Sequence, residues 1–277
     1  MRLSTQVCLT LNHLTPRPLR PRLRGRTSPQ EYFDEQYRDG PGALTVFHNL
    51  VSLQGKRVLD LGCGLGGKTC YFARGGASFV MGIDKDPRLI DTGIKLMASE
   101  GVDNVELAVG DAKKLPFNSS SFDVVIMTDA MEHIPRPNIE FCLTESLRIL
   151  RPGGRLCLHF PPWTCPLAGH LYDVLWLPWC HLLFGDDVLK EALEHLGTPE
   201  QNGSLNYWDH FKELNRITFD EFRGFLPHLP AKVVLLERTT FGRFFGPLNV
   251  ARVPVVGKYA TRHVVCVLEK LESTNVA

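Results

Sequence analysis

The stretch LDLGCGLGGKT, residues 59–69, decides how the rest of the chain is interpreted. Gly62, Gly64 and Gly67 fit the dinucleotide-binding pattern G-x-G-x-x-G. The same residues also fit the phosphate-binding loop G-x-x-x-x-G-K-T, which would end at the Lys68-Thr69 pair. Both patterns place a ligand at a glycine turn that follows a strand. The residues around this turn must therefore decide which ligand it serves.

Short apolar runs and helix-length segments alternate around this turn. The apolar runs are 57–61, 79–84, 105–111, 122–129 and 154–160. The helix candidates are 67–75, 87–100 and 137–150. Near-continuous apolar strands separated by helices predict an α/β fold with a doubly wound parallel sheet. Two later runs, 232–241 and 262–270, predict closing strands, so the sheet would be Rossmann-like, seven-stranded and mostly parallel.

The domain organisation follows from composition and charge. Residues 1–29 are rich in arginine and proline and contain no acidic residue, which predicts a disordered basic tail. Such a tail is also compatible with an arm for nucleic acid or anionic lipid, a transit peptide, or a dispensable extension. Residues 30–277 are expected to form a single domain, with the aromatic-rich segment 161–217 inserted after the fifth strand as a cap.

Net charge, the length of the apolar runs and the cysteine spacing give no support for several classes of protein. The net charge of +1 gives no general argument for nucleic-acid binding, and no apolar run is long enough to span a membrane. The eight cysteines form no C-x-x-C pair and no metal-ligand spacing, so we expect reduced thiols, no metal and a cytoplasmic location.

Four acidic residues follow the first four strands of the predicted sheet: Asp60, Asp84, Asp111 and Asp129. Ligands of open α/β sheets bind at the carboxyl ends of the strands, so these carboxylates would border one crevice. Surplus negative charge disfavours a triphosphate or a pyrophosphate. It suits a ligand that combines ribose and adenine with a cationic reacting end, as S-adenosylmethionine does.

The chain resembles the class I S-adenosylmethionine-dependent methyltransferases at this point. VLDLGCGLGG resembles their first motif, and GIDKDP, VGDAKKLPF, FDVVIMTDAMEHI and RILRPGGRL resemble the later motifs in the same order. The resemblance covers about residues 31–160. It implies a sheet with an antiparallel last strand, S-adenosylmethionine as the cofactor, and methyl transfer to a small-molecule acceptor.

The resemblance also implies roles for individual residues. Gly62, Cys63 and Gly64 would let the backbone approach the cofactor, and Asp60 and Asp129 would lie beside its methionine end. Asp84, followed by Lys85, would accept hydrogen bonds from the ribose hydroxyls. Asp111 and Ala112 would meet the adenine. Asp111 and Asp129 could instead cap a turn and a helix.

The candidates for catalysis and for acceptor binding are less specific. His133 follows the fourth strand and His170 lies in the insertion, so either could act as a general base. The insertion's aromatic residues suggest a sizeable, partly apolar acceptor such as a lipid, a quinone, a polyketide or a sugar-lipid, with these candidate contacts: Trp163, Tyr172, Trp176 and Trp208. They could equally form the insertion's own core. The alternatives to a methyltransferase are a P-loop nucleotide hydrolase and a non-catalytic methyltransferase-fold binding protein.

Overall fold

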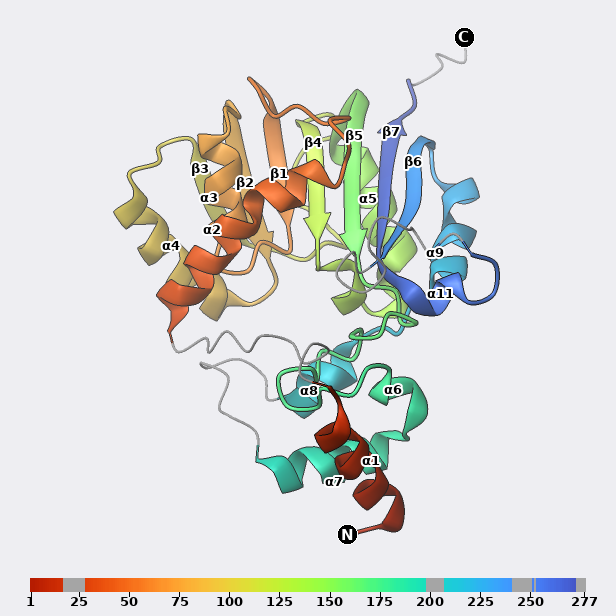
Figure 1. Cartoon of the computed structure of the whole chain (residues 1–277). Coiled ribbons are helices and arrows are strands. Elements are labelled where there is room, and N and C mark those ends of the chain that lie inside the picture. Colours follow the sequence, from red (N-terminus) through yellow and green to blue (C-terminus); the bar gives the residue numbers. More distant parts are fainter. Residues whose placement is uncertain (17–27, 198–206, 241–250, 252, 273–277) are drawn as a thin grey trace. The chain divides into compact units, whose positions relative to one another are not determined.

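The computed structural model describes residues 1–16, 28–197, 207–240, 251 and 253–272 (Figure 1). Its strands form one seven-stranded sheet in the order β3-β2-β1-β4-β5-β7-β6. The strands are β1 (Arg57–Leu61), β2 (Phe79–Asp84), β3 (Val105–Val109), β4 (Phe122–Thr128), β5 (Leu150–Phe160), β6 (Ala231–Thr240) and β7 (Thr261–Lys270). Strands β1 to β5 pair in parallel and β7 runs antiparallel to β5, which confirms the predicted fold class.

The predicted helices between the strands are present, with ends that differ by at most two residues. The α-helices are α1 (Leu3–Leu14), α2 (Pro29–Thr45), α3 (Gly67–Arg74), α4 (Pro87–Glu100), α5 (Ile139–Ile149), α6 (Cys180–Leu183), α7 (Asp186–Leu196), α8 (Tyr207–Glu213), α9 (Phe219–Phe225) and α11 (Gly257–Ala260). The 3₁₀ turns are η2 (Met131–His133), η3 (Arg136–Asn138) and η4 (Leu226–His228). Strand β4 is buried along most of its length, which fits a central strand covered on both faces.

The chain falls into two compact units, and the single domain expected over 30–277 stays a prediction. The sheet unit comprises Ser28–Phe160, Asp220–Glu237 and Val264–Ala277. The helical unit comprises Met1–Thr27, Pro161–Phe219 and Arg238–His263. The segment predicted as a cap contains α7, whose Leu189 and Leu193 are buried in an apolar cluster with residues of α8. This segment therefore has an apolar core of its own, in line with the alternative weighed for its aromatic residues.

The prediction of a disordered tail over 1–29 is wrong for its first half. Residues Leu3–Leu14 form α1, which packs against α7 in the helical unit. Thr5, Cys8 and Asn12 are buried in that contact. The helix contains no proline and no arginine, so the composition that predicted disorder belongs to the residues after it. Of those, residues 17–27 lie outside the described part of the chain.

The expectations about cysteines and membrane spans can be compared with the structure directly. All eight cysteines are buried free thiols, in agreement with the predicted absence of a disulfide framework. Among the helices of the described residues, none combines the length and the apolar character needed to cross a bilayer.

Helix α2 crosses α3 so closely that glycine is required at the contact. A Cβ atom at Gly40 would lie 2.3 Å from the ring of Tyr71, and one at Gly67 would lie 2.2 Å from the carbonyl oxygen of Phe33. Ala43, Phe47 and Phe72 then pack in one apolar cluster with residues of the central strands. The crossing brings the middle of α2 next to the glycine loop that precedes α3.

Two glycines of α2 give a matched test of this crossing. Gly40→Ala should lower the free energy of unfolding by about 1–3 kcal/mol, because the new methyl group overlaps Tyr71. Gly42→Ala has open space around its Cβ and should raise it by about 0.4–1 kcal/mol. Urea denaturation followed by circular dichroism measures both. Equal effects of the two substitutions would contradict the close crossing.

Candidate functional site

The glycine loop between β1 and α3 has a backbone that only glycine adopts easily. Gly62, Gly64 and Gly66 have positive φ angles of 81°, 58° and 85°. The N–H groups of Gly62 and Cys63 both donate to the carbonyl oxygen of Ile83, at 2.8 Å and 3.1 Å. The loop after β1 is thereby anchored to β2. It stands at the switch point of the sheet, because β1 is flanked by β2 and β4.

Neighbouring elements enclose the loop on two sides. A Cβ atom at Gly62 would lie 2.4 Å from the Cβ of Ala130, so the turn after β4 presses against the loop. A Cβ atom at Gly64 would lie 3.0 Å from the Nε2 of Gln36 on α2. Glycine at these positions therefore serves the packing of the loop, besides any approach of a ligand to the backbone.

Asp84 holds the loop from the end of β2. Its Oδ2 accepts a hydrogen bond of 2.9 Å from the N–H of Gly64, and its Oδ1 accepts one of 3.0 Å from the N–H of Asp86. The carboxylate is thus fixed at the carboxyl end of the strand beside the glycine loop. Lys85, the next residue, is exposed.

Asp60 lies inside the protein beneath the loop. Its carboxylate is buried and accepts a hydrogen bond of 2.7 Å from the hydroxyl of Thr69. Burial raises the pKa of Asp60 to about 6, against the lowering effects of the Thr69 hydrogen bond and the nearby Lys68. The carboxylate therefore tethers the first turn of α3 to β1, a structural task that the sequence analysis did not assign to it.

Lys68, at the start of α3, is held by a hydroxyl and a carboxylate from the end of β4. Its Nζ donates to the hydroxyl of Thr128 at 3.0 Å and to the carboxylate of Asp129 at 3.1 Å. Its side chain is only 15% exposed. Burial lowers the pKa of Lys68, but Asp129 outweighs burial and the net shift is upward. The ion pair joins the start of α3 to the end of β4.

These contacts argue against the phosphate-binding loop. In such a loop the lysine meets the phosphates and the threonine hydroxyl meets Mg²⁺. Here Lys68 is paired with Asp129, and the Thr69 hydroxyl donates to Asp60. Both side chains point to carboxylates, where a phosphate would be repelled.

Asp129 connects three elements at the switch point. It has a positive φ of 55°, and its N–H donates to the carbonyl oxygen of His159 at 2.8 Å. Its carboxylate lies 3.5 Å from the Nδ1 of His159, in addition to its contact with Lys68. His159 is the penultimate residue of β5, and sequence reasoning missed it because a lone histidine in an apolar strand carries no motif.

The turn after β4 adds a buried acid and a half-buried histidine. Glu132 on η2 is 4% exposed. Burial raises its pKa well above the usual value, and the neighbouring Asp129 raises it further. His133, a predicted base, follows it and is half-buried. Glu132 is a second residue that sequence reasoning missed, although it lies within the quoted motif.

Asp111 and Ala112 follow β3, where the sequence placed them. The Oδ1 of Asp111 accepts the N–H of Lys113 at 2.9 Å, and its Oδ2 lies 3.3 Å from the Nζ of Lys113. Asp111 is more than half exposed. The structure thus contains the turn-capping contact that was weighed as the alternative role for this residue.

Helix α2 contributes a residue that no motif announced. The Oε1 of Gln36 accepts a long hydrogen bond of 3.4 Å from the N–H of Gly67, and its Nε2 lies beside Gly64. Tyr32, one turn earlier on the helix, is close enough to raise the pKa of Lys68 slightly. The sequence analysis gave no signal for either residue.

The aromatic residues predicted to bind an acceptor lie in the helical unit. Trp163 packs against His181, with ring centroids 4.4 Å apart, and Trp208 stacks on Phe211 at 5.5 Å. The backbone N–H of Trp176 donates to Asn12 at 2.6 Å. Trp163 and Trp208 border the apolar cluster of this unit, which favours the alternative that they form its core.

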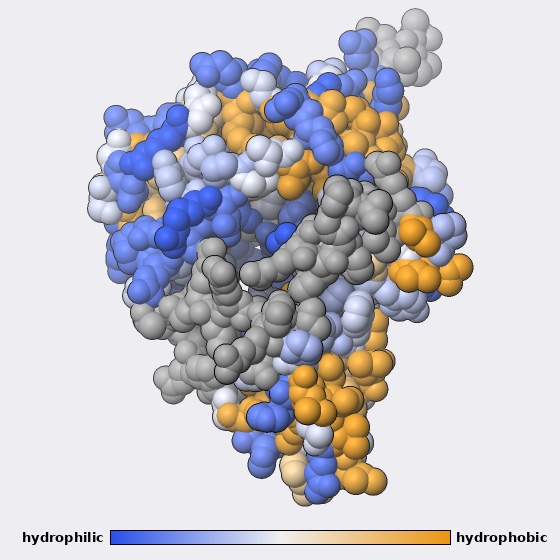
Figure 2. All heavy atoms as spheres, in the orientation of Figure 1, coloured by the Kyte–Doolittle hydropathy of each residue, from blue (hydrophilic) through white to orange (hydrophobic). Residues whose placement is uncertain are grey.

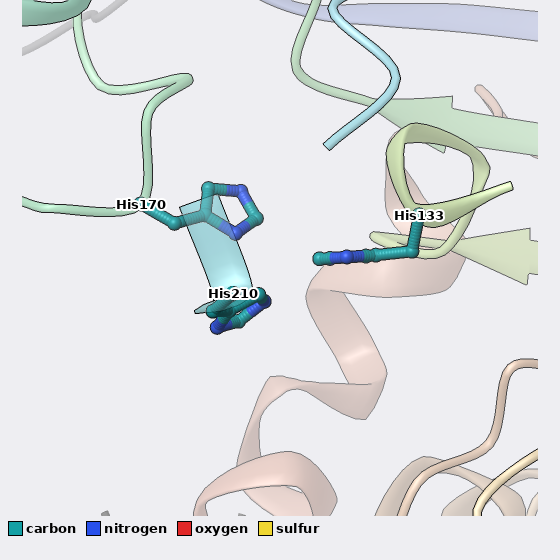
Figure 3. A group of neighbouring side chains, drawn as sticks. All are labelled: His133, His170 and His210. Carbon is teal, nitrogen blue, oxygen red and sulfur yellow. The ribbon is translucent and has the colours of Figure 1, made fainter. Parts of the chain in front are cut away.

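His170 and Tyr172 belong to a separate group of rings in the helical unit. The His170 ring lies edge to face with the ring of His210, with centroids 5.3 Å apart (Figure 3). It is also 6.4 Å from the ring of Tyr172. His170 has a positive φ of 52°, which is uncommon for a residue with a side chain. Unlike Trp163 and Trp208, His170 and Tyr172 are not part of the unit's apolar cluster.

The glycine loop of the sheet unit is surrounded mainly by acidic side chains. Three carboxylates, those of Asp60, Asp84 and Asp129, lie around the glycine loop, and Lys68 is the cation paired with one of them. This set of donors and acceptors fits a ligand with ribose hydroxyls and a positive charge better than one with phosphates.

Comparison with known proteins agrees with this description. Residues 58–154 match the family model described as "Methyltransferase domain". The chain is 39% identical over 137 residues to a phthiotriol/phenolphthiotriol dimycocerosates methyltransferase of Mycobacterium leprae, covering 46% of each chain. It is 32% identical to a demethylmenaquinone methyltransferase of Staphylococcus aureus, covering 54% of this chain and 61% of that one. The chain thus spans about half the length of the curated relatives that it matches.

A solved structure extends the likeness to most of the chain. An S-adenosylmethionine-dependent methyltransferase of Methanosarcina mazei superposes with a TM-score of 0.56 at 20% identity, covering 82% of this chain and 98% of the other. This likeness concerns the fold. Residues 58–154 thus match a methyltransferase domain, and the fold of the chain resembles that of an S-adenosylmethionine-dependent methyltransferase.

The buried Asp60 predicts a specific dependence of stability on pH. Its folded pKa of about 6 lies above its unfolded value, so the native state binds the proton more tightly between pH 4 and 6. The stability of the native protein relative to Asp60→Asn should therefore rise as the pH falls through this window, by up to about 3 kcal/mol. Urea denaturation of both proteins at several pH values measures the difference.

Asp86→Asn is the matched control for this experiment. A hydrogen bond from Arg88 lowers the pKa of Asp86. The ionised Asp86 carboxylate therefore stabilises the folded protein, and this stabilisation is lost as the pH falls through the lowered pKa, which is the opposite trend to that of Asp60. The difference in the free energy of unfolding between the native protein and Asp60→Asn could instead stay constant from pH 4 to 6.5. That result would show that folding does not raise the pKa of Asp60.

Proposed function

We propose that the protein is an S-adenosylmethionine-dependent methyltransferase that acts on a small, partly apolar acceptor. The observation that carries the proposal is the hydrogen bond from the Gly64 N–H to the Asp84 carboxylate, which fixes an acid beside a glycine loop at the switch point of the sheet. The match of residues 58–154 to a methyltransferase domain supports the same conclusion.

The proposed cofactor contacts follow the order of the strands. Asp84, with Lys85 beside it, would meet the ribose hydroxyls, and the backbone of Gly62, Cys63 and Gly64 would line the sugar and the methionine. Asp111 and Ala112 would meet the adenine. Asp60 and Asp129 supply negative charge for the ammonium and sulfonium, Asp129 from a half-exposed position and Asp60 from within the protein.

The cofactor supplies an activated methyl group, so the protein mainly has to align it with an acceptor. Alignment of reacting atoms can contribute about 7–11 kcal/mol. A base is needed only where the acceptor must lose a proton, and it then contributes about 10²–10⁴-fold. His133 is the proposed base within the sheet unit, because it is half-buried and lies in the turn after β4, close in sequence to Asp129.

The acceptor is proposed to be lipid-like or a quinone. The support is the similarity to proteins named for methylation of phthiotriol dimycocerosates and of demethylmenaquinone. In the helical unit, His170 and Tyr172 are the stronger candidates for acceptor contacts. Trp176 stays a candidate, whereas the packing of Trp163 and Trp208 favours a structural role for them.

Calorimetric titration tests the cofactor assignment. The full chain should bind S-adenosylmethionine and S-adenosylhomocysteine with micromolar affinity and should not bind ATP–Mg²⁺ or NAD⁺. Asp84→Ala should weaken binding at least tenfold, because it removes both the ribose acceptor and the support of Gly64. Asp86→Asn is the control, since it keeps the backbone N–H that donates to Asp84 and should bind within about threefold of the native protein.

Two results would overturn the assignment. Binding of ATP–Mg²⁺ that Lys68→Ala abolishes would restore the phosphate-binding loop. Binding of S-adenosylmethionine without transfer of a radiolabelled methyl group to any extractable quinone or hydroxylated lipid would favour the non-catalytic binding protein.

The role of His133 has its own test once an acceptor is found. If His133 is the base, His133→Gln should lower kcat by about 10²–10⁴-fold while the affinity for S-adenosylhomocysteine stays unchanged. The acidic limb of the pH–rate profile should disappear as well. His48→Gln is the control, because His48 lies elsewhere in the sheet unit in an exposed ion pair with Glu237. An unchanged kcat for His133→Gln would assign His133 a structural role and direct the same test to His170.

A further inference from the structure

Lys68 joins the two strand ends between which the switch point lies. It is the second residue of α3, directly after the glycine loop that follows β1. Its Nζ donates to the hydroxyl of Thr128, the last residue of β4, and to the carboxylate of Asp129. Strands β1 and β4 are neighbours in the sheet, and open α/β sheets bind ligands outside such a pair of carboxyl ends. The ammonium group of Lys68 therefore lies at the edge of the sheet where a ligand would bind.

The side chain of Lys68 carries its positive charge in this position. Burial lowers the pKa of Lys68, but the charge of Asp129 and its hydrogen bond reverse the shift, so the ammonium form persists at neutral pH. Only 15% of the side chain is exposed, so dissolved salt screens this charge less than it screens the charge of a surface lysine.

Asp129 stays accessible to a second cation while Lys68 is bound to it. Its side chain is 48% exposed. Lys68 contacts the Oδ2 atom, and the Oδ1 atom lies 3.5 Å from the Nδ1 of His159. An ionised carboxylate has about four lone-pair sites on its two oxygens. A cationic ligand can therefore approach the exposed side of Asp129 without displacing Lys68, and the two cations would then share one carboxylate.

The pairing of Lys68 with Asp129 changes how the site attracts charge. The ion pair as a whole has no net charge. With a neutral residue at position 68, the carboxylate of Asp129 would be left without this counter-ion. Charges near a protein surface interact more strongly than they do in bulk water, because the effective dielectric constant is lower. Lys68 therefore weakens the attraction of the site for a cation and affects an uncharged group far less.

Two molecules that differ by one positive charge can report this effect. S-adenosylmethionine has a sulfonium group, whereas S-adenosylhomocysteine has an uncharged thioether at the same position. Their adenosine and amino-acid parts are identical. The ratio of their dissociation constants therefore measures how strongly the site prefers a positive charge, and the contacts that both molecules make cancel from that ratio.

We propose that Lys68 is a specificity-determining residue, which limits the preference of the site for the cationic methyl donor over the uncharged product. It does so by compensating the charge of Asp129, which brings the affinities of the two molecules closer together. This inference rests on the proposed function, because that function places the methionine end of the cofactor beside Asp129.

Calorimetric titration of the full chain with each molecule at pH 7 tests the proposal. Lys68→Met should raise the preference for S-adenosylmethionine over S-adenosylhomocysteine by about fivefold or more, because Asp129 loses its counter-ion. Asp129→Asn should lower the preference by about fivefold or more, because the charge of Lys68 is then uncompensated. Lys68→Arg keeps the charge and should leave the preference within about twofold of the native value.

Lys95→Met is the matched control for the loss of one positive charge. Lys95 is exposed on α4, and Figure 2 shows mainly hydrophilic side chains over the α2 and α4 side of the sheet unit. Solvent and salt screen an exposed charge, so this substitution should leave the preference within about twofold of the native value. A purely structural role of Lys68 would lower both affinities together and would leave their ratio unchanged.

The outcomes separate this inference from the proposed function. Both molecules could bind the native chain while Lys68→Met leaves the preference unchanged, or while Lys68→Met and Asp129→Asn shift it in the same direction. Either result would overturn the role of Lys68 and leave the cofactor assignment intact. If neither molecule binds the native chain, the proposed function fails, and the role of Lys68 fails with it. Should Lys68→Met not fold, the shift in Asp129→Asn decides by itself.

Discussion

The hydrogen bond from the Gly64 N–H to the Asp84 carboxylate is the contact on which the arrangement of the site depends. It joins the loop after β1 to the end of β2, while Gly62 presses against Ala130 after β4. Three strand ends thereby converge on one backbone turn. The positive φ angles at Gly62 and Gly64 make that turn possible, and any side chain there would collide with a neighbouring element.

Several charged groups at the site are either buried or held in an ion pair. Asp60 is buried and its pKa is raised, Lys68 is paired with Asp129, and Glu132 is buried with a raised pKa of its own. The ion pair cancels one carboxylate charge, and burial favours the protonated forms of Asp60 and Glu132. A cationic ligand would be attracted to the carboxylates of Asp84 and Asp129 at this edge of the sheet.

The two units divide the chain according to where its apolar side chains are buried. The sheet unit buries its strands beneath α2 and α3, whereas the helical unit buries residues of α7 and α8, such as Leu189 and Phe211, in a cluster of its own. Helix α1 joins that second cluster through Cys8, and its Leu3, Val7, Leu11 and Leu14 side chains stay exposed. The terminal segment that composition alone marks as a tail is thus partly a structural element.

The sequence by itself determined the α/β fold, the succession of strands and helices along the chain, and the position of the glycine loop. These features depend on apolar periodicity and on glycine turns, which are local properties of the chain. The tertiary structure alone decided that Lys68 pairs with Asp129, that Gln36 and His159 reach the site, and that α1 turns its polar face inward. Each of these depends on which distant segments meet across a packed interface, and local patterns do not contain that information.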